Sequence, residues 1–309
     1  MRPTIVTERE PMKDTQPGRV VISYGQEAIV ETADGLLQRC KLRRRVGRPV
    51  CGDYVAWRAS SESDGVIERI EPRQNVVARP DYRAKLRPLA ANVDLMVIVV
   101  AVEPEFTREL IDRYLVLAES LEIKAALWVN KIDLLSVEAR RDLEDSLASY
   151  RELGYPVDFG STTSEASINP LREGLRDATS VLVGQSGVGK SSLVNTLLPD
   201  QQVRVGALSH ASGQGRHTTT ETTLYHLPDG GHLIDSPGIR TLRLGHLNPE
   251  QIEHGFIEFR AFHGQCKFNN CRHINEPGCA IAAAAQAGAI NHERLESFRT
   301  IIAAEEKAY

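Results

Sequence analysis

Two short motifs in this chain stand in an order that restricts its fold more than any other feature of the sequence. Asn-Lys-Ile-Asp at residues 130–133 precedes the glycine-rich run at 184–191, and Asp-Ser-Pro-Gly at 235–238 follows it. In ordinary guanine-nucleotide-binding domains the glycine-rich run comes first. A nucleotide pocket is built from loops at the carboxyl ends of parallel strands, so it can survive a change of chain order. The sequence therefore predicts a circularly permuted α/β domain cut after the Asp-x-x-Gly loop.

The run at 184–191 has the form Gly-x4-Gly-Lys-Ser, whose glycines let backbone N–H groups wrap phosphates closely. A strand predicted over 180–183 enters it and a helix predicted over 190–198 leaves it, which is the context a phosphate site needs. We expect Lys190 to contact the β and γ oxygens and Ser191 to bind magnesium. The other predicted contacts of this loop are Gly184, Gln185, Ser186, Gly187, Val188, Gly189 and Ser192.

The tetrapeptide before the loop predicts guanine as the base. The Asp133 carboxylate can accept hydrogen bonds from guanine N1–H and the 2-amino group, whereas adenine would leave the carboxylate unpaired. We expect Asn130 to support the base and its loop, and the Lys131 stem to lie over the purine plane. The predicted contacts of this motif are Asn130, Lys131, Ile132 and Asp133.

Two further segments are predicted to sense the γ-phosphate. Asp235 is expected to reach magnesium through water, with the Gly238 N–H facing the γ-phosphate. The run 215–220 is the predicted first switch, in which Thr218 or Thr219 supplies a metal-contacting hydroxyl. The alternative for this run is a plain polar loop.

Catalysis needs a group that orients the attacking water. Ile239 follows Gly238 at the position where Ras-type enzymes carry a glutamine, and isoleucine cannot orient water. His217 is the nearest polar candidate for that role. Its alternative is a surface contact to RNA or phosphate.

The amino-terminal part of the chain is basic, although the whole chain carries a net charge of −4. Residues 17–88 hold 14 Lys and Arg against 9 Asp and Glu, while residues 89–309 hold 20 against 29. The densest cluster predicts a polyanion contact, with a solvated loop as the alternative. Its members are Lys41, Arg43, Arg44, Arg45 and Arg48.

Short β-rich runs surround this cluster and predict a small barrel of the oligonucleotide-binding (OB) type. The expected strands are 20–24, 27–32, 36–42, 53–58 and 66–70. Trp57, Cys40 and Cys51 are expected in its core. After residue 80 the pattern alternates strands with helices, as in a parallel α/β sheet. The expected elements there are strands 92–102, 123–129, 157–160 and 232–234, and helices 109–121, 137–153 and 169–176.

Three of the five cysteines fall close together with a histidine near the carboxyl end, as Cys266-x4-Cys271-x-His273-x5-Cys279. Three thiolates and one imidazole fill a tetrahedral zinc site with no open position, which predicts one structural ion. A chance cluster is the alternative. Residues 281–309 are alanine-rich and helical in pattern.

Neither a secretory signal nor a membrane-spanning run is found in the sequence, so we expect a cytoplasmic protein. The predicted organisation has four parts: a tail at 1–16, an RNA-binding OB barrel at 17–79, a permuted GTPase domain at 80–245, and a mainly helical zinc domain at 246–309. The cut in the G domain would place the Asp-x-x-Gly switch directly before the zinc domain, so nucleotide state could act on that domain.

Together these motifs resemble the ribosome small-subunit-dependent GTPase A family (RsgA or YjeQ type) over residues 18 to about 300. The resemblance implies a base contact near Ser161 and Thr162, rRNA binding, and late maturation of the small ribosomal subunit with subunit-stimulated GTP hydrolysis. We expect a monomer without membrane association. Two other interpretations stay open: a translation- or tRNA-associated GTPase, and an RNA-binding scaffold that holds GTP without turnover.

Overall fold

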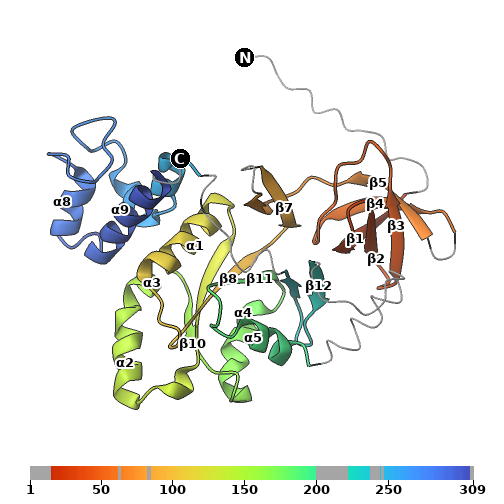
Figure 1. Ribbon diagram of the computed structural model, residues 1–309, viewed down its shortest axis with the longest axis horizontal. Coiled ribbons are helices and arrows are strands. Elements are labelled where there is room, and N and C mark those ends of the chain that lie inside the picture. The colour runs from red at the N-terminus through yellow and green to blue at the C-terminus, as the bar shows by residue number, and fades with distance from the viewer. Residues whose placement is uncertain are drawn as a thin grey trace.

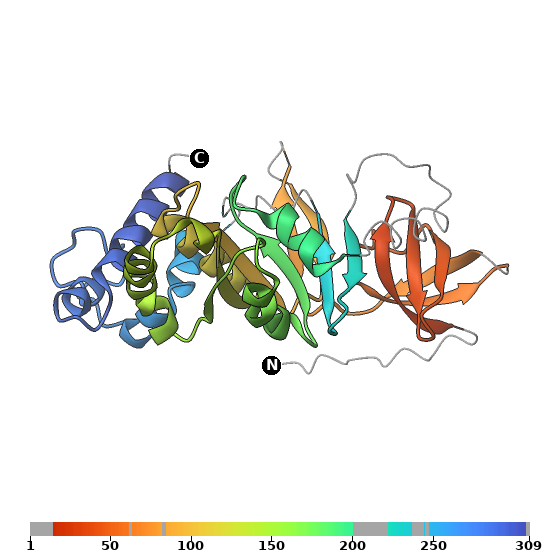
Figure 2. The ribbon, with the colours of Figure 1, turned by 90° about the horizontal axis from the view of Figure 1, so that it is seen from below.

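The computed structural model describes residues 15–61, 64–81, 85–199, 222–236, 244 and 247–306. Three parts follow one another along a long molecule, with the barrel at one end and the helical carboxyl-terminal module at the other (Figures 1 and 2). No helix within these ranges is long and apolar enough to cross a bilayer.

Five strands form the amino-terminal barrel: β1 (Gln16–Ser23), β2 (Glu27–Thr32), β3 (Leu37–Leu42), β4 (Tyr54–Ala59) and β5 (Asp64–Ile70). The barrel closes because β1 pairs with both β2 and β4, and β5 lies between β3 and β4. Its interior holds Val20, Val30, Ile67 and Trp57, which is 3% exposed. The predicted OB-type barrel and its core tryptophan are therefore confirmed.

Both barrel cysteines are buried, free thiols. Burial raises the pKa of the Cys40 thiol to about 12 and raises that of Cys51 as well. They are consequently poor nucleophiles, as core cysteines are expected to be.

A two-stranded hairpin, β6 (Val76–Pro80) with β7 (Leu86–Ala91), joins the barrel to the central domain. The sequence did not predict this hairpin, and the expected boundary between residues 79 and 80 falls inside β6. Gly52 packs against the hairpin so closely that an added Cβ would lie 2.2 Å from the Ala91 carbonyl oxygen. Its φ is +91°, so glycine is needed there on both counts.

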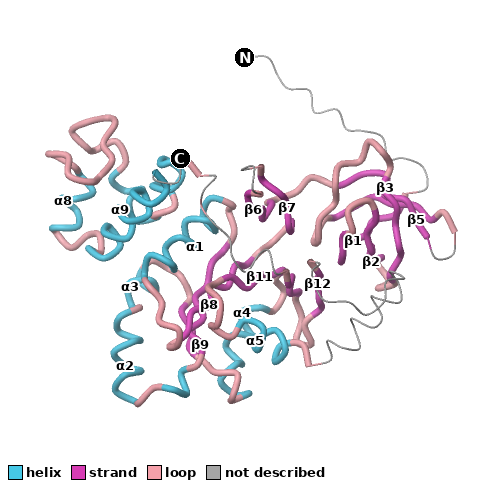
Figure 3. Tube along the Cα trace, viewed as in Figure 1, coloured by secondary structure: helices cyan, strands magenta, loops and turns pink. Residues whose placement is uncertain are grey.

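The central sheet has the strand order β10-β9-β8-β11-β13-β12, and every neighbouring pair except β13–β12 is parallel. Its strands are β8 (Leu95–Ala101), β9 (Lys124–Asn130), β10 (Val157–Phe159), β11 (Thr179–Val183), β12 (Thr223–His226) and β13 (His232–Asp235). Its helices are α1 (Arg108–Ser120), α2 (Val137–Ser146), α3 (Ala148–Glu152), α4 (Asn169–Leu175) and α5 (Lys190–Leu197). The distribution of helices and strands is drawn in Figure 3.

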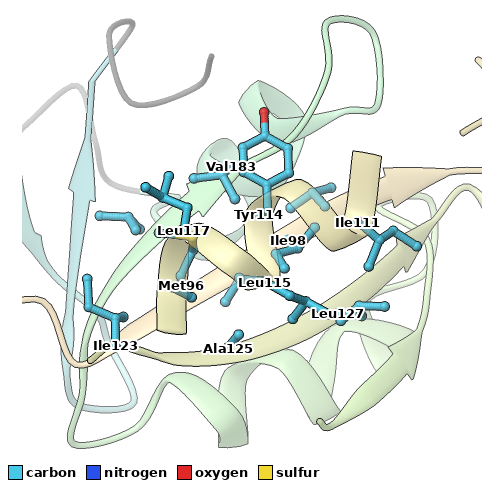
Figure 4. Packing of buried hydrophobic residues seen from close by; sticks show 14 of the residues in the cluster. Met96, Ile98, Ile111, Tyr114, Leu115, Leu117, Ile123, Ala125, Leu127 and Val183 are labelled. Atoms are coloured by element: carbon cyan, nitrogen blue, oxygen red, sulfur yellow. The ribbon is translucent and has the colours of Figure 1, made fainter. Parts of the chain in front are cut away.

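Helix α1 covers one face of this sheet with an apolar stripe. Ile111, Tyr114 and Leu115 meet Ile98 and Leu127 of the central strands (Figure 4). All are at least 95% buried. This packing fixes the carboxyl ends of β8 and β9, where the expected base reader begins.

The expected single helix over 137–153 is instead two, with a break at Leu147. Helix α2 has no buried residue, whereas Leu147 is 1% exposed and Tyr150 is fully buried. The Tyr150 hydroxyl donates to Asp112 at 2.8 Å. Turning the chain at Leu147 is what brings both side chains into the core.

The carboxyl-terminal module contains α7 (Pro249–His254), the 3₁₀ helix η4 (Ile257–Phe262), α8 (Ala280–Gln286) and α9 (His292–Glu306). It packs on α1 through a buried ion cluster. Arg294, 2% exposed, pairs with Glu258 at 2.7 Å and with Asp112 of α1, which is fully buried. Its guanidinium also lies 4.5 Å from the Phe256 ring centroid. The module is thus attached to the central domain through buried charge as well as apolar contact.

The barrel is joined to the opposite edge of the central sheet. Strand β1 pairs with β12 at Ile22 and Thr223, which makes one continuous sheet of the barrel and central strands. Beside this pairing, His226 contacts the Glu31 carboxylate at 2.7 Å. The edge strand of the central domain therefore has the barrel as its neighbour.

Candidate nucleotide site and metal centre

The loop between β11 and α5 curves so tightly that a side chain would not fit at two of its positions. Both positions are glycines. A Cβ at Gly184 would lie 2.1 Å from the Val99 carbonyl oxygen, and one at Gly189 would lie 2.3 Å from Asn130 Nδ2. Their φ values are +138° and +94°. Helix α5 begins directly after the loop, so the loop lies at the positive end of a helix dipole.

The Lys190 side chain lies inside the curve of this loop and is only 6% exposed. Its Nζ donates to the Gly184 carbonyl oxygen at 2.6 Å and to that of Gln185. These two carbonyl oxygens hold the Lys190 ammonium inside the loop. Oxygens of a bound phosphate could replace them as its hydrogen-bond acceptors there. The geometry thus suits the role predicted for Lys190.

The base-reading motif lies directly beside the phosphate loop. Asn130, 1% exposed, donates from Nδ2 to the Val188 carbonyl oxygen at 2.8 Å. Lys131 Nζ donates to the carbonyl oxygens of Gly187 at 2.8 Å and of Glu103 at 2.7 Å. Two segments that are distant in sequence are therefore fastened together, as a single nucleotide pocket requires.

A third loop, which the sequence did not identify, also supports the phosphate loop. Gln185 Nε2 donates to the carbonyl oxygens of Pro104 and Glu105 at 3.2 and 3.0 Å. This loop has no recognisable motif. The available signal was its position directly after the buried strand β8, at the same sheet edge as the other two loops.

The loop predicted to contribute a further base contact lies beside the base reader. The Ile132 N–H donates to the Gly160 carbonyl oxygen at 3.3 Å. Ser161 is buried and Thr162 half-buried, whereas Asp133 is exposed. The structure thus brings Ser161 and Thr162 to the same edge of the sheet as Asp133.

The expected magnesium contacts are placed only in part. Asp235 ends β13, which runs parallel to β11, so this residue lies next to the strand that enters the phosphate loop. Ser191 is exposed in the first turn of α5. The remaining predicted residues of this group lie outside the described ranges: His217, Thr218, Thr219 and Gly238.

The four residues predicted to bind zinc come together in the carboxyl-terminal module. One ligand atom from each of Cys266, Cys271, His273 and Cys279 falls within 4.8 Å of the others. His273 Nδ1 lies 3.2 Å from Cys279 Sγ and 3.6 Å from Cys266 Sγ. This donor set and compactness fit a closed metal site with no position for substrate.

The surroundings of the cluster also suit a metal site. Glu253 of α7 lies 3.3 Å from His273 Nε2, which leaves Nδ1 directed at the thiols. The Ala280 N–H donates to Cys266 Sγ at 3.3 Å, and the Ala282 N–H donates to Cys279 Sγ at 3.4 Å. Backbone N–H groups of this kind stabilise thiolates.

The basic cluster of the barrel runs from the end of β3 into the loop that follows it. Arg43 pairs with Glu68 at 2.9 Å, and Arg58 pairs with the same carboxylate at 2.6 Å. Arg44 and Arg45 are exposed, as are Lys41 and Arg48 at the edges of the cluster. One of the five predicted contacts is thus partly engaged within the barrel, and Arg44 and Arg45 are better placed for an external polyanion.

Comparison with known proteins identifies the family. A family model described as RsgA GTPase matches residues 70–245. The chain belongs to the RsgA GTPase family. As a member of that family it is a GTP hydrolase.

Curated relatives match over nearly the whole chain. A protein from Sodalis glossinidius named small ribosomal subunit biogenesis GTPase RsgA is 47% identical and covers 94% of this chain and 86% of its own length. A protein of the same name from Chromohalobacter salexigens is 51% identical, covering 92% of this chain and 85% of its own.

Solved structures agree with the permuted arrangement. YjeQ from Thermotoga maritima superposes with a TM-score of 0.76 at 32% identity, covering 93% of this chain and 97% of that one. YloQ, described as a circularly permuted GTPase, gives 0.78 at 26% identity, covering 98% and 99%. The permuted G domain flanked by a barrel and a zinc-type module is thereby confirmed as the fold.

Proposed function

We propose that this GTPase acts in biogenesis of the small ribosomal subunit, binding rRNA and hydrolysing GTP slowly until the subunit stimulates it. One structural observation supports this most strongly: a barrel with an exposed basic loop shares a continuous sheet with the domain that carries the nucleotide loops. The names of the relatives from Sodalis and Chromohalobacter point to the same process. We place the protein in the cytoplasm as a monomer.

In this proposal the chain's own residues bind and orient the nucleotide. Asp133 selects guanine, Asn130 holds the base loop against the phosphate loop, and Lys190 neutralises charge on the β and γ oxygens. Ser191 and Asp235 would hold magnesium, which supplies further neutralisation of the phosphates when bound.

Slow intrinsic turnover follows from the residue after Gly238. Because Ile239 offers no hydrogen bond to water, water orientation is assigned to His217, with Thr218 or Thr219 completing the magnesium site. Subunit binding would bring these residues into place. This is the step at which the small subunit would accelerate hydrolysis.

The cluster of Cys266, Cys271, His273 and Cys279 is assigned to one zinc ion. Its role is structural, because four protein ligands leave no open coordination position. The ion would stabilise the loop between η4 and α8, which has little apolar core of its own.

The decisive experiment measures phosphate release from GTP and from ATP, with and without purified small subunits. We expect release from GTP only, accelerated by small subunits and not by large subunits or tRNA. His217→Ala should bind GTP and dock on subunits normally but lose the acceleration. Acceleration by tRNA instead would favour the translation-associated interpretation. Absence of release with subunits present would favour the non-hydrolysing scaffold.

A further inference from the structure

A cavity of about 750 Å³ lies at the end of the central sheet opposite the nucleotide loops. Its lining includes Leu95 and Lys124, which begin β8 and β9, and Gly174 of α4. Helix α4 has only seven residues, so it leaves the sheet beneath it incompletely covered. Leu95 and Ala126 are accordingly only half-buried. The cavity therefore has an apolar floor open to a ligand.

One wall of this cavity contains an unsatisfied donor. Trp128 lines the cavity and is 1% exposed. Its indole N–H has no acceptor among the residues that the structure describes. The indole nitrogen has less than 1 Å² of accessible surface, so a ligand in the cavity would meet carbon atoms of the indole rather than this N–H.

A second hollow of about 900 Å³ adjoins the first one at Glu119, which lines both. It lies between the carboxyl end of α1 and the module elements α7 and η4. We call the two together the amino-end trough. The trough runs from α4 to the zinc-type module, along the edge of the sheet remote from the glycine-rich loop.

Negative charge predominates in the trough. No cation in the described part of the chain lies within ion-pair distance of the carboxylates of Glu122, Asp158, Asp177 or Glu250. Of the lining cations, Arg260 is already paired with Glu119 at 2.8 Å. Burial also raises the pKa of Asp158 above its ordinary value, with Arg151 opposing the shift. Seven aspartates and glutamates line the trough against three lysines and arginines, Lys124, Arg176 and Arg260, so its lining is net negative.

We propose that the amino-end trough docks a basic peptide segment of a partner protein, with an apolar side chain in the α4 cavity and flanking lysines or arginines on the carboxylates. Nucleic acid is disfavoured because its phosphates would meet these carboxylates. This partner surface is separate from the basic barrel loop and goes beyond the proposed RNA and nucleotide contacts.

The test uses the full-length protein and a short fluorescent peptide with central leucines flanked by lysines and arginines. Gly174→Leu fills the cavity without a collision, because nothing lies within 4 Å of a Cβ at this position. Asp158→Lys reverses a lining charge. Glu138→Lys, an equal charge change on the exposed surface of α2 outside the trough, is the matched control. Fluorescence anisotropy gives the affinity across a salt series, and GTP hydrolysis is measured for every variant.

We expect salt-dependent binding of the basic peptide by the wild type, weakened roughly tenfold by Gly174→Leu and by Asp158→Lys and unchanged by Glu138→Lys. GTP hydrolysis should be unaffected in all three variants. Peptide affinity and GTP hydrolysis are therefore independent readouts, and failure of this proposal would not count against the proposed function. Equal binding of a glutamate-substituted peptide, or unchanged affinity in both trough variants, would overturn the proposal. So would a trough variant that loses affinity for a single-stranded RNA and not for the peptide.

Discussion

Replacing Arg294 with methionine should detach the carboxyl-terminal module from the central domain. The Arg294 guanidinium is 2% exposed and is the partner of both Asp112, which is fully buried, and Glu258, whose side chain is 8% exposed. Methionine keeps most of the volume but removes the charge, so two carboxylates remain together without a cation. Breaking a buried pair in this way costs about 3–5 kcal/mol. Loss of the contact with the buried Phe256 ring adds roughly 2 kcal/mol, because this cation and ring are both shielded from water.

This defect should depend on pH. Burial raises the pKa of Asp112 above its ordinary value even with Arg294 present, although Arg294 and Tyr150 oppose the shift. Without the guanidinium the folded-state pKa rises further. A carboxyl whose folded pKa exceeds its unfolded pKa destabilises the fold by the full amount above the folded pKa. The penalty decreases as pH falls below that value and vanishes below the unfolded pKa. Arg294→Met should therefore be less destabilised at acidic than at neutral pH.

The assay is urea unfolding at several pH values, followed by tryptophan fluorescence and by zinc release to a chromogenic chelator. We expect zinc release to shift to lower urea before the tryptophan transition does, because the module lies next to the lesion. Adding Asp112→Asn and Glu258→Gln to Arg294→Met should recover part of the loss. A total loss below about 1 kcal/mol, or no recovery after neutralisation, would refute the claim that uncompensated charge causes the defect.

Three other changes test the candidate site. Asp133→Asn should weaken GTP binding and improve binding of xanthosine triphosphate, since an amide can donate to a 2-oxo group; a nucleotide competition assay measures this. Cys271→Ala should release zinc while GTP binding survives, as elemental analysis and nucleotide titration would show. Arg44→Ala with Arg45→Ala should reduce small-subunit affinity and the steepness of its salt dependence while basal hydrolysis stays near wild type. Unchanged binding across the salt series would exclude this loop as an RNA contact.

Local sequence patterns predicted those elements whose identity depends on near neighbours. The barrel strands were predictable because each is a short run rich in β-forming residues, bounded by turn residues such as Gly25 and Gly35. The phosphate loop and the Cys-His cluster were predictable because each puts its chemistry in a short run. The structure adds the hydrogen bond from Asn130 to the Val188 carbonyl oxygen, which no local sequence pattern could predict.

The missed elements depend on partners far away in the chain or break a local rule. Strand β12 has four residues, and one of its neighbours is β1, about 200 positions earlier. The hairpin of β6 and β7 includes Pro80 and Pro88, which normally argue against a strand. The break at Leu147 reflects a demand for burial in the assembled core rather than any helix-breaking residue. Such features become visible only once tertiary packing is known.

The hairpin of β12 and β13 connects the barrel with the central domain. The chain segments that precede and follow it contain the predicted switch residues, while its outer strand pairs with the barrel through Ile22 and Thr223. A ligand on the barrel and a nucleotide at the predicted switch residues would therefore both act on one shared hairpin. Thermodynamic linkage then makes their effects equal in both directions: by whatever factor GTP tightens the barrel's hold on a polyanion, that polyanion must tighten the hold on GTP.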